Sequence, residues 1–265
     1  MTGGTYEDLR YEVDGPVARL TIDREAQRNA LSWGLVAEMR RALAAAKADP
    51  TVRVVVLTGA GDRAFCAGAD LTGMAAGAGF AELHAGRGGL ADLFREMYAL
   101  GKPTIARVRG FALAGGFGLA MACDLVVASD DAVFGTPEVD LGLWPHMITV
   151  PLLRSMPPKR VLELMLTGRR IDAAEADRLG LLTSLVTPEE LDSTVARLAA
   201  VLAAKPPDTV RQGRDSFYAV WDRGVDDSLR LLHPLLTITA SSPEAVEGIA
   251  SFSEKRPPRW AVEPQ

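Results

Sequence analysis

The chain has 265 residues, of which 48% are hydrophobic and 24% charged; this balance is typical of a folded globular protein and excludes intrinsic disorder. Its formal net charge of -5 provides no general attraction for nucleic acid or an anionic membrane, so we expect neither as a partner. No apolar run approaches the roughly 18 residues that span a bilayer, and the polar N-terminus lacks a secretion signal. Cys66 and Cys123 match no disulfide or metal pattern. Together these features predict a cytoplasmic protein.

The N-terminal part of the chain predicts strands and a helix in alternation. Residues 6–24 read as two strands around a turn at Gly15. Ser32 is a suitable N-cap for an Ala-rich helix that ends near Pro50. Residues 52–59 are nearly all apolar and rich in Val, which predicts a strand covered on both faces.

The middle of the chain continues this alternation after a segment rich in Gly and Ala. That segment, residues 72–89, is predicted to form a mobile loop or lid. An amphipathic helix over 90–100 and a buried strand over 103–110 are expected next. Residues 112–124 join a glycine cluster to a helix, and 124–135 predict two short strands.

The order of these elements predicts the fold class. Strands that alternate with helices indicate an α/β structure in which helices pack on sheets. From about Pro157 onward the pattern predicts helices only. An all-helical tail after an α/β core suggests that the tail docks elsewhere, such as on a partner subunit.

Several common site motifs are missing from the sequence. It contains neither a Gly-x-Ser-x-Gly elbow nor a Walker loop, and its histidines lie too far apart for a local metal motif. Gly116 and Gly118 begin a dinucleotide-type pattern, but Met121 replaces the third glycine. The sequence therefore gives little support for a Rossmann site.

Two strand–glycine–helix junctions remain, one within residues 56–70 and one within 108–118. Each can present an unpaired backbone N–H at a helix start, where the helix dipole favours negative charge. Two such donors that converge on one oxygen form an oxyanion hole, which stabilises an enolate or a tetrahedral oxyanion. The alternative is that both junctions are only tight turns, which are common in α/β proteins.

Six segments then match one family in order and spacing. They are DREAQRNALS (23–32), AFCAGADL (64–71), GFALAGGFGLAMACDLVVAS (110–129), AVFGTPEVDLGLWP (132–145), LELMLTGRRIDAAEADRLGLLTSLV (162–186) and FSEKRPP (252–258). On these segments the chain resembles the enoyl-CoA hydratase/isomerase (crotonase) superfamily, and the resemblance extends over essentially the whole chain. The resemblance implies a crotonase-like spiral core of repeated ββα units over 1–195. It also implies a C-terminal helical region over 196–265 that builds homotrimers, often stacked into hexamers.

The substrate implied by this resemblance is a coenzyme A thioester, with no cofactor and no metal. By position, the N–H groups of Ala69 and Gly115 would form the oxyanion hole around the thioester oxygen. The resemblance also implies that the backbone around Ala26 to Arg28, and around Ala67 and Asp70, contacts the adenine end of CoA. The basic candidates for the CoA phosphates are Arg24, Arg28 and Lys255. The alternative for these three is a solvated surface charge.

Glu138 falls where many members of this family keep a catalytic glutamate. A separate physical argument supports a role of Glu138 in proton transfer, because it is a lone carboxylate beside Phe134, Val139 and Leu141. A carboxyl in apolar surroundings has a raised pKa, which suits a group that carries protons near neutral pH. The alternative is a surface acid or a helix cap after Pro137.

Position 118 departs from the family pattern, and this bears on the reaction. Hydratases with two glutamates place the second one here, whereas this chain has Gly118. Hydration needs one group to activate water and another to protonate the α-carbon, while one base is enough to move a double bond. We therefore favour isomerisation and keep three alternatives open: hydration, another enolate reaction of the crotonase type, and a non-catalytic acyl-CoA-binding scaffold.

A second candidate for proton transfer is His146, at a position where some isomerases and dehalogenases of the superfamily carry an aspartate. The alternative is that His146 caps the next helix or packs against Trp144. Candidate walls of the acyl pocket are Met74, Phe94 and Trp144, although each also suits plain core. Cys66 lacks a nearby base, so a packing role is expected.

Overall fold

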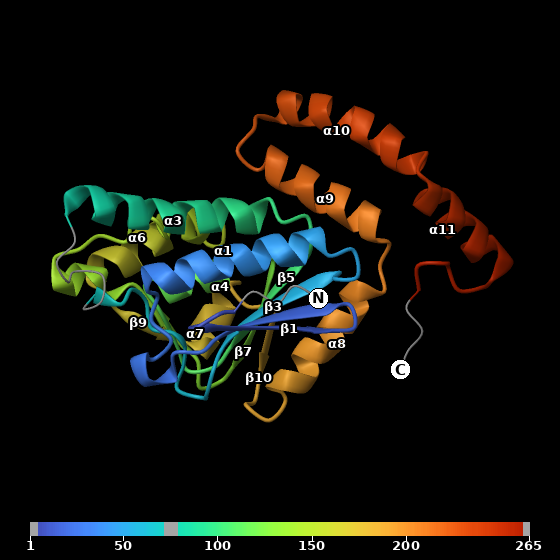
Figure 1. The fold of residues 1–265 in the computed structure, drawn as a ribbon. Helices are drawn as coiled ribbons and strands as arrows, with labels where there is room; N and C mark the ends of the chain where they lie inside the picture. Colours follow the sequence, from blue (N-terminus) through green and yellow to red (C-terminus); the bar gives the residue numbers. More distant parts are fainter. Residues whose placement is uncertain (1–4, 72–78, 262–265) are drawn as a thin grey trace.

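The core of the protein contains two β-sheets, and the chain passes repeatedly from one sheet to the other (Figure 1). The computed structural model describes residues 5–71 and 79–261. The larger sheet has the strand order β1 (Leu9–Asp14), β2 (Val17–Ile22), β3 (Val54–Gly59), β5 (Thr104–Val108), β7 (Leu125–Ser129) and β10 (Ser184–Val186). The smaller sheet has the order β4 (Ala64–Cys66), β6 (Phe111–Leu113), β8 (Val133–Gly135) and β9 (Arg170–Asp172).

After the hairpin of β1 and β2, three successive turns of the chain each add one strand to the larger sheet and one to the smaller sheet before a helical segment follows. The pairs β3 and β4, β5 and β6, and β7 and β8 repeat this pattern, with parallel neighbours in both sheets. The helices of the core are α1 (Trp33–Ala48), α3 (Phe80–Tyr98), α4 (Gly115–Ala122), α5 (Thr149–Leu153), α6 (Pro158–Thr167), α7 (Ala173–Arg178) and α8 (Leu191–Ala203), with the 3-10 helices η1 (Glu25–Gln27) and η2 (Pro137–Leu141). The predicted α/β spiral of ββα units is confirmed.

Strand β3 shows how the larger sheet is covered on both faces. Val55 and Leu57 belong to the main core with side chains of α1 and α3, whereas Val54 and Val56 pack with side chains of α8. Because successive side chains of a strand point to opposite faces, this alternation buries every residue of β3. The two-sided burial predicted from the sequence is confirmed.

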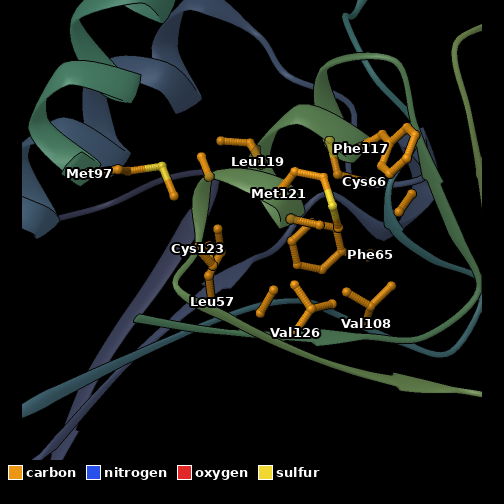
Figure 2. Close-up of a cluster of buried hydrophobic side chains, with 14 of the residues drawn as sticks. Leu57, Phe65, Cys66, Met97, Val108, Phe117, Leu119, Met121, Cys123 and Val126 are labelled. Atoms are coloured by element: carbon orange, nitrogen blue, oxygen red, sulfur yellow. The ribbon is translucent and has the colours of Figure 1, made fainter. Parts of the chain in front are cut away.

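Helix α4 is anchored in the apolar core shown in Figure 2. Phe65 of β4 and Phe117 of α4 are almost completely buried, and the Phe117 ring lies 5.4 Å from the ring of Phe134 in β8. Burying one such side chain contributes about 1.5–3 kcal/mol. This packing fixes the start of α4 against the ends of the smaller sheet, where both glycine junctions lie.

The prediction of a loop over 72–89 is wrong for its second half. Residues 80–89 form the first turns of α3, while residues 72–78 lie outside the described part of the chain. The physical reason is a tertiary contact, because a Cβ on Gly86 would lie 2.6 Å from the Trp33 ring of α1. The glycine that weakens the helix locally is what lets α1 and α3 pack closely.

Two further expectations for the C-terminal part need correction. Strands β9 and β10 lie in the stretch after Pro157 that was predicted to contain helices only. Each is three residues long and depends on pairing with β8 or β7, so no local pattern marks it. The expected boundary between residues 195 and 196 falls inside α8, which packs on the larger sheet as a whole. In the structure the core therefore extends to the end of α8.

After α8 the chain forms an arm that projects from the core (Figure 1). The arm consists of α9 (Pro207–Val220), α10 (Val225–Ala240) and α11 (Pro243–Glu254). Every residue of α9 and α10 is at least partly exposed, and Leu236, Ile249 and Phe252 are exposed by 67% or more. Among the described residues, the structure contains no helix with the length and apolar character needed to cross a membrane.

A polar joint centred on Asp124 ties the arm to the core. The Asp124 carboxylate accepts hydrogen bonds from Thr104, from Arg214 Nε at 2.9 Å and from the Tyr218 hydroxyl. Arg214 also donates to the backbone oxygens of Met97 and Tyr98. Its side chain is only 7% exposed, so its charge depends on these partners.

Replacing Asp124 with Ala is expected to lower the free energy of unfolding by about 3 kcal/mol, because it leaves the buried Arg214 charge without its carboxylate. Urea denaturation of both proteins measures this difference. The control is Asp226→Ala, which removes an exposed ion pair to Arg230 and is expected to cost about 0.5 kcal/mol or less. Equal effects of the two substitutions would contradict the importance of this joint.

Candidate active site

The two glycine junctions lie side by side in the structure. β4 and β6 are parallel neighbours, so the segments that leave their carboxyl ends emerge next to each other. A Cβ on Gly115 would lie 4.0 Å from the Cα atom of Gly68 and 3.0 Å from the Leu31 side chain. The fold therefore brings Gly115 together with the segment that contains Ala69.

Backbone hydrogen bonds fix the orientation of Ala69. The N–H of Leu31 donates to Gly68 O at 2.7 Å, and the N–H of Asp70 donates to Leu31 O at 2.8 Å. Ala69 thus pairs with Leu31 as in a parallel sheet, and its own N–H points away from Leu31. Ala69 is also exposed. Its N–H is therefore free to face a ligand.

Gly115 is the first residue of α4, so its N–H has no acceptor within the helix. The preceding Ala114 has a φ of +50° and donates its N–H to Gly135 O at 2.8 Å. A non-glycine residue in this conformation is strained, and such strain concentrates at functional sites. The turn presents the N-terminus of α4, with its partial positive charge, next to Ala69.

Gly116 explains the close approach of α4 to the smaller sheet. A Cβ on Gly116 would lie 2.0 Å from the Cys66 backbone oxygen, which is far inside van der Waals contact. Cys66 itself is buried in the cluster of Figure 2, and burial raises the pKa of its thiol to about 12. A thiolate is therefore absent near neutral pH, in agreement with the expected packing role of Cys66.

Glu138 lies in η2, shortly after the Gly135 oxygen that accepts from Ala114. This link places Glu138 at the same end of the smaller sheet as Gly115. Its carboxylate is half-buried, and Oε2 is buried without a hydrogen-bond partner within residues 5–71 and 79–261. Desolvation raises the pKa of the Glu138 carboxyl above its ordinary value. This is the environment that the sequence predicts for a proton carrier.

The space next to Gly118 is filled by apolar side chains. A Cβ on Gly118 would lie 2.2 Å from Cγ2 of Ile148 and 3.3 Å from Cζ of Phe94. Ile148 and Phe94 are both buried. Any side chain at position 118 would therefore displace Ile148. Sequence reasoning missed Ile148, because the contact joins α4 to α5.

Some of the residues expected around CoA lie on the surface, whereas Arg24 lies mostly buried in a group of ion pairs. Ala26 and Arg28 are exposed on and just after η1, and Arg28 O accepts from the Ala67 N–H at 3.1 Å. Arg24 is 13% exposed and pairs with Asp8 and Asp70 at 3.1 and 3.0 Å. This geometry favours a role for Arg24 in holding the two segments together over direct contact with a phosphate.

Asn29 anchors the same loop and was missed by the sequence patterns. Its side-chain amide donates to Ala60 O and Ala64 O at 3.0 and 2.7 Å, and its Oδ1 accepts from the Arg24 N–H. Its φ is +57°, which Asn tolerates better than most residues. A buried Asn in a polar turn is the signal that could have identified it.

Lys255 lies apart from the other CoA candidates within one chain. It caps α11 at the end of the arm, and nearby Trp260 O accepts a hydrogen bond from Arg53. Arg53 directly precedes β3, whereas Arg28 lies beyond the opposite end of the neighbouring, parallel β2. The structure therefore does not bring Lys255 to Arg28.

The remaining candidates lie on the surface near η2. Trp144 is 36% exposed and His146 is exposed, with the His146 N–H donating to Trp144 O at 2.8 Å. The N-cap of α5 is Ile148 and lacks a side-chain cap within the described residues, so His146 does not cap this helix. Phe94 is core, as described above, and Met74 lies outside the described residues.

A cavity of about 460 Å³ lies at the other end of α4, away from Gly115. Its walls include Tyr98, Met121, Asp124 and Trp221. These residues belong to the joint between the arm and the core, so the cavity is separate from the candidate active site.

The family model for enoyl-CoA hydratase/isomerase matches residues 12–263. A carnitinyl-CoA dehydratase of Proteus mirabilis is 35% identical over 96% of this chain and 98% of its own length. An enoyl-CoA hydratase structure from Mycobacterium smegmatis superimposes with a TM-score of 0.92 at 32% identity, over 96% of this chain and 99% of that one. An enoyl-CoA hydratase structure from Bacillus anthracis gives 0.91 at 30% identity, over 97% and 100%.

The fold is thus that of the crotonase-type spiral enzymes. The chain belongs to the enoyl-CoA hydratase/isomerase family.

Proposed function

We propose that this enzyme moves a double bond within the acyl group of a coenzyme A thioester through a stabilised enolate. The observation that supports this proposal is the closed space at Gly118, where a Cβ would lie 2.2 Å from Cγ2 of Ile148, so that position 118 has no room for a second carboxylate. Glu138 is then the principal proton carrier, and one carrier is sufficient for isomerisation.

The N–H groups of Ala69 and Gly115 are proposed to donate to the thioester carbonyl oxygen. As charge develops on this oxygen, fixed donors stabilise it, and losing one donor of this kind costs about 10²–10³ in rate. Glu138 in its carboxylate form takes a proton from the α-carbon of a 3-enoyl thioester, which gives a dienolate. The protonated Glu138 returns the proton to the γ-carbon, which gives the 2-enoyl product. His146 is the proposed assistant in proton transfer.

The CoA part is proposed to lie along the segments that hold Ala26, Arg28, Ala67 and Asp70. Arg28 is the exposed cation of this surface. Lys255 would have to come from another subunit, because the structure keeps it away from Arg28 within one chain. The exposed apolar side chains of α10 and α11 support self-association into a homotrimer or hexamer.

Hydration is the competing reaction, since two of the related structures carry the name enoyl-CoA hydratase. A non-catalytic acyl-CoA binder is the other alternative. The desolvated Glu138 argues against a binder, because an oxygen that is buried without a hydrogen-bond partner among the described residues, as Oε2 is, costs folding free energy and serves no purpose in binding alone.

Incubation with 2-enoyl and 3-enoyl thioesters in deuterated water, followed by product identification, tests the proposal. We expect interconversion of the two classes with deuterium at the α- or γ-carbon, and no 3-hydroxyacyl product at enzymatic rates. A 3-hydroxyacyl product formed faster than the isomer would establish hydration instead. Binding without any turnover of either class would establish the binder.

A further inference from the structure

We propose that Ile148 sets the acyl-group specificity of this enzyme by excluding branches at C3, the β-carbon of the acyl group. This inference rests on the proposed function, because it assumes that the thioester oxygen binds at Gly115. It assigns to Ile148 a role in selecting the substrate that goes beyond the absence of a carboxylate at Gly118.

The geometry of α4 brings C3 to this position. Gly115 and Gly118 are three residues apart in one helix, so they share a face and lie about 4.5 Å apart along the axis. A carbonyl oxygen held at the Gly115 N–H lies about 2.9 Å in front of the first turn. Because Cα–Cβ bonds of a helix tilt toward its N-terminus, a Cβ on Gly118 would lean toward the same end of α4, and Cγ2 of Ile148 lies 2.2 Å from that Cβ position. The three bonds from the oxygen to C3 span up to about 3.8 Å, which brings C3 toward the Ile148 methyl group.

The wall that Ile148 forms is rigidly held. Ile148 is 2% exposed and stands at the N-cap of α5, where its backbone oxygen accepts from the Leu152 N–H at 3.1 Å. Phe94 of α3, 5% exposed, supports the same space from another helix. A β-branched side chain has few rotamers, so Ile148 cannot swing away easily. The wall is thus fixed by two helices, and one extra methyl group on the substrate meets it.

Discrimination by one methyl group in an apolar pocket amounts to about 10–200-fold. We expect the wild-type protein to bind butanoyl-CoA at least about tenfold more tightly than 3-methylbutanoyl-CoA. Both thioesters are saturated, so calorimetry measures their dissociation constants without any chemical step. The ratio of the two constants is the quantity that reports on Ile148.

Ile148→Ala is expected to reduce this ratio to about threefold or less, because it opens the space for the extra methyl group. Ile148→Leu, which removes the Cγ2 branch that lies against Gly118 and keeps the volume of the side chain, is expected to give an intermediate ratio. The matched control is Leu152→Ala, a buried position one turn further along α5. It loses comparable packing and should keep the wild-type ratio.

The outcomes separate this inference from the proposed function. If butanoyl-CoA binds and the ratio stays at its wild-type value in both Ile148 variants, the role of Ile148 is refuted while the proposed function stands. A wild-type ratio near one would also refute it. If neither thioester binds to the wild-type protein, both proposals fail. Should Ile148→Ala fail to fold, the ratio in Ile148→Leu decides the question.

Discussion

Replacing Glu138 with Gln is expected to lower kcat/KM for the favoured enoyl thioester by about 10²–10⁴-fold, the usual contribution of a positioned proton carrier. Gln keeps the size and polarity of the side chain but cannot accept the proton. The dissociation constant of butanoyl-CoA should stay within about twofold of the wild-type value, because Glu138 acts in proton transfer and not in holding the thioester. Steady-state kinetics and calorimetry measure the two quantities.

The raised pKa of Glu138 also predicts the pH dependence of activity. Glu138 must be ionised to take a proton, so kcat/KM should rise with pH through a pKa above the ordinary value for glutamate. In Glu138→Gln this rise should vanish from the residual activity. A pH profile that rises at the ordinary glutamate pKa would contradict the desolvation of this carboxyl.

As pH rises, the contribution of Glu138 to the free energy of unfolding should fall while kcat/KM rises. The folded protein holds the Glu138 proton over a pH range in which the unfolded chain has lost it, so the free energy of unfolding falls as pH rises through that range. Above the raised pKa the full cost of the buried charge is present. Glu138→Gln removes this cost and should be at least as stable as the wild-type protein at pH 7. Lost activity with retained stability identifies a functional carboxylate.

The control for this substitution is Asp140→Asn, an exposed acid in the same short helix η2. It removes one negative charge near Glu138 without touching the proposed proton path. Its kcat/KM should stay close to the wild-type value. Full activity of Glu138→Gln, or equal losses in the two variants, would refute the assigned role.

Local sequence signals were sufficient to predict most of the helices and strands of the fold. The Ser32 N-cap is confirmed because its side chain accepts from the Leu35 N–H within the same turn. Strand β3 was recognised because its β-branched run is covered on both faces, which leaves no ambiguity of pattern. The glycine cluster at the start of α4 was recognised because a backbone approach of this kind requires glycine.

The rest depends on contacts between distant segments, which leave no local pattern. Gly86 lies inside α3, where a Cβ would come within 2.6 Å of the Trp33 ring of α1, a contact between distant segments that the local sequence does not show. Arg24 looks like a free surface cation in the sequence, but Asp8 and Asp70 surround it in the fold. The absence of a carboxylate at position 118 was visible in the sequence, whereas the contact of Ile148 with this position was not.

Gly116→Ala is expected to be the most damaging small substitution at the site. The new Cβ would lie 2.0 Å from the Cys66 backbone oxygen, and backbone cannot rotate away as a side chain can. The first turn of α4 must therefore move off β4, which costs about 1–3 kcal/mol in the free energy of unfolding. The same movement separates Gly115 from Ala69. Because a displacement of about 1 Å costs about 100-fold in rate, kcat/KM should fall by at least that factor.

Gly213→Ala provides the matched control, since Gly213 is in α9 and a Cβ there would meet nothing within 4 Å. It introduces the same methyl group into a helix and should raise the free energy of unfolding by about 0.5–1 kcal/mol. Urea denaturation and steady-state kinetics are measured for both variants. Gly116→Ala reports the effect of the steric clash, and Gly213→Ala reports the effect of helix propensity alone. If Gly116→Ala lost stability but kept its full kcat/KM, the two junctions would not act together on one oxygen. An oxyanion hole that depends on this close approach requires two results. Gly116→Ala should lower the free energy of unfolding while Gly213→Ala raises it, and kcat/KM should fall only in Gly116→Ala.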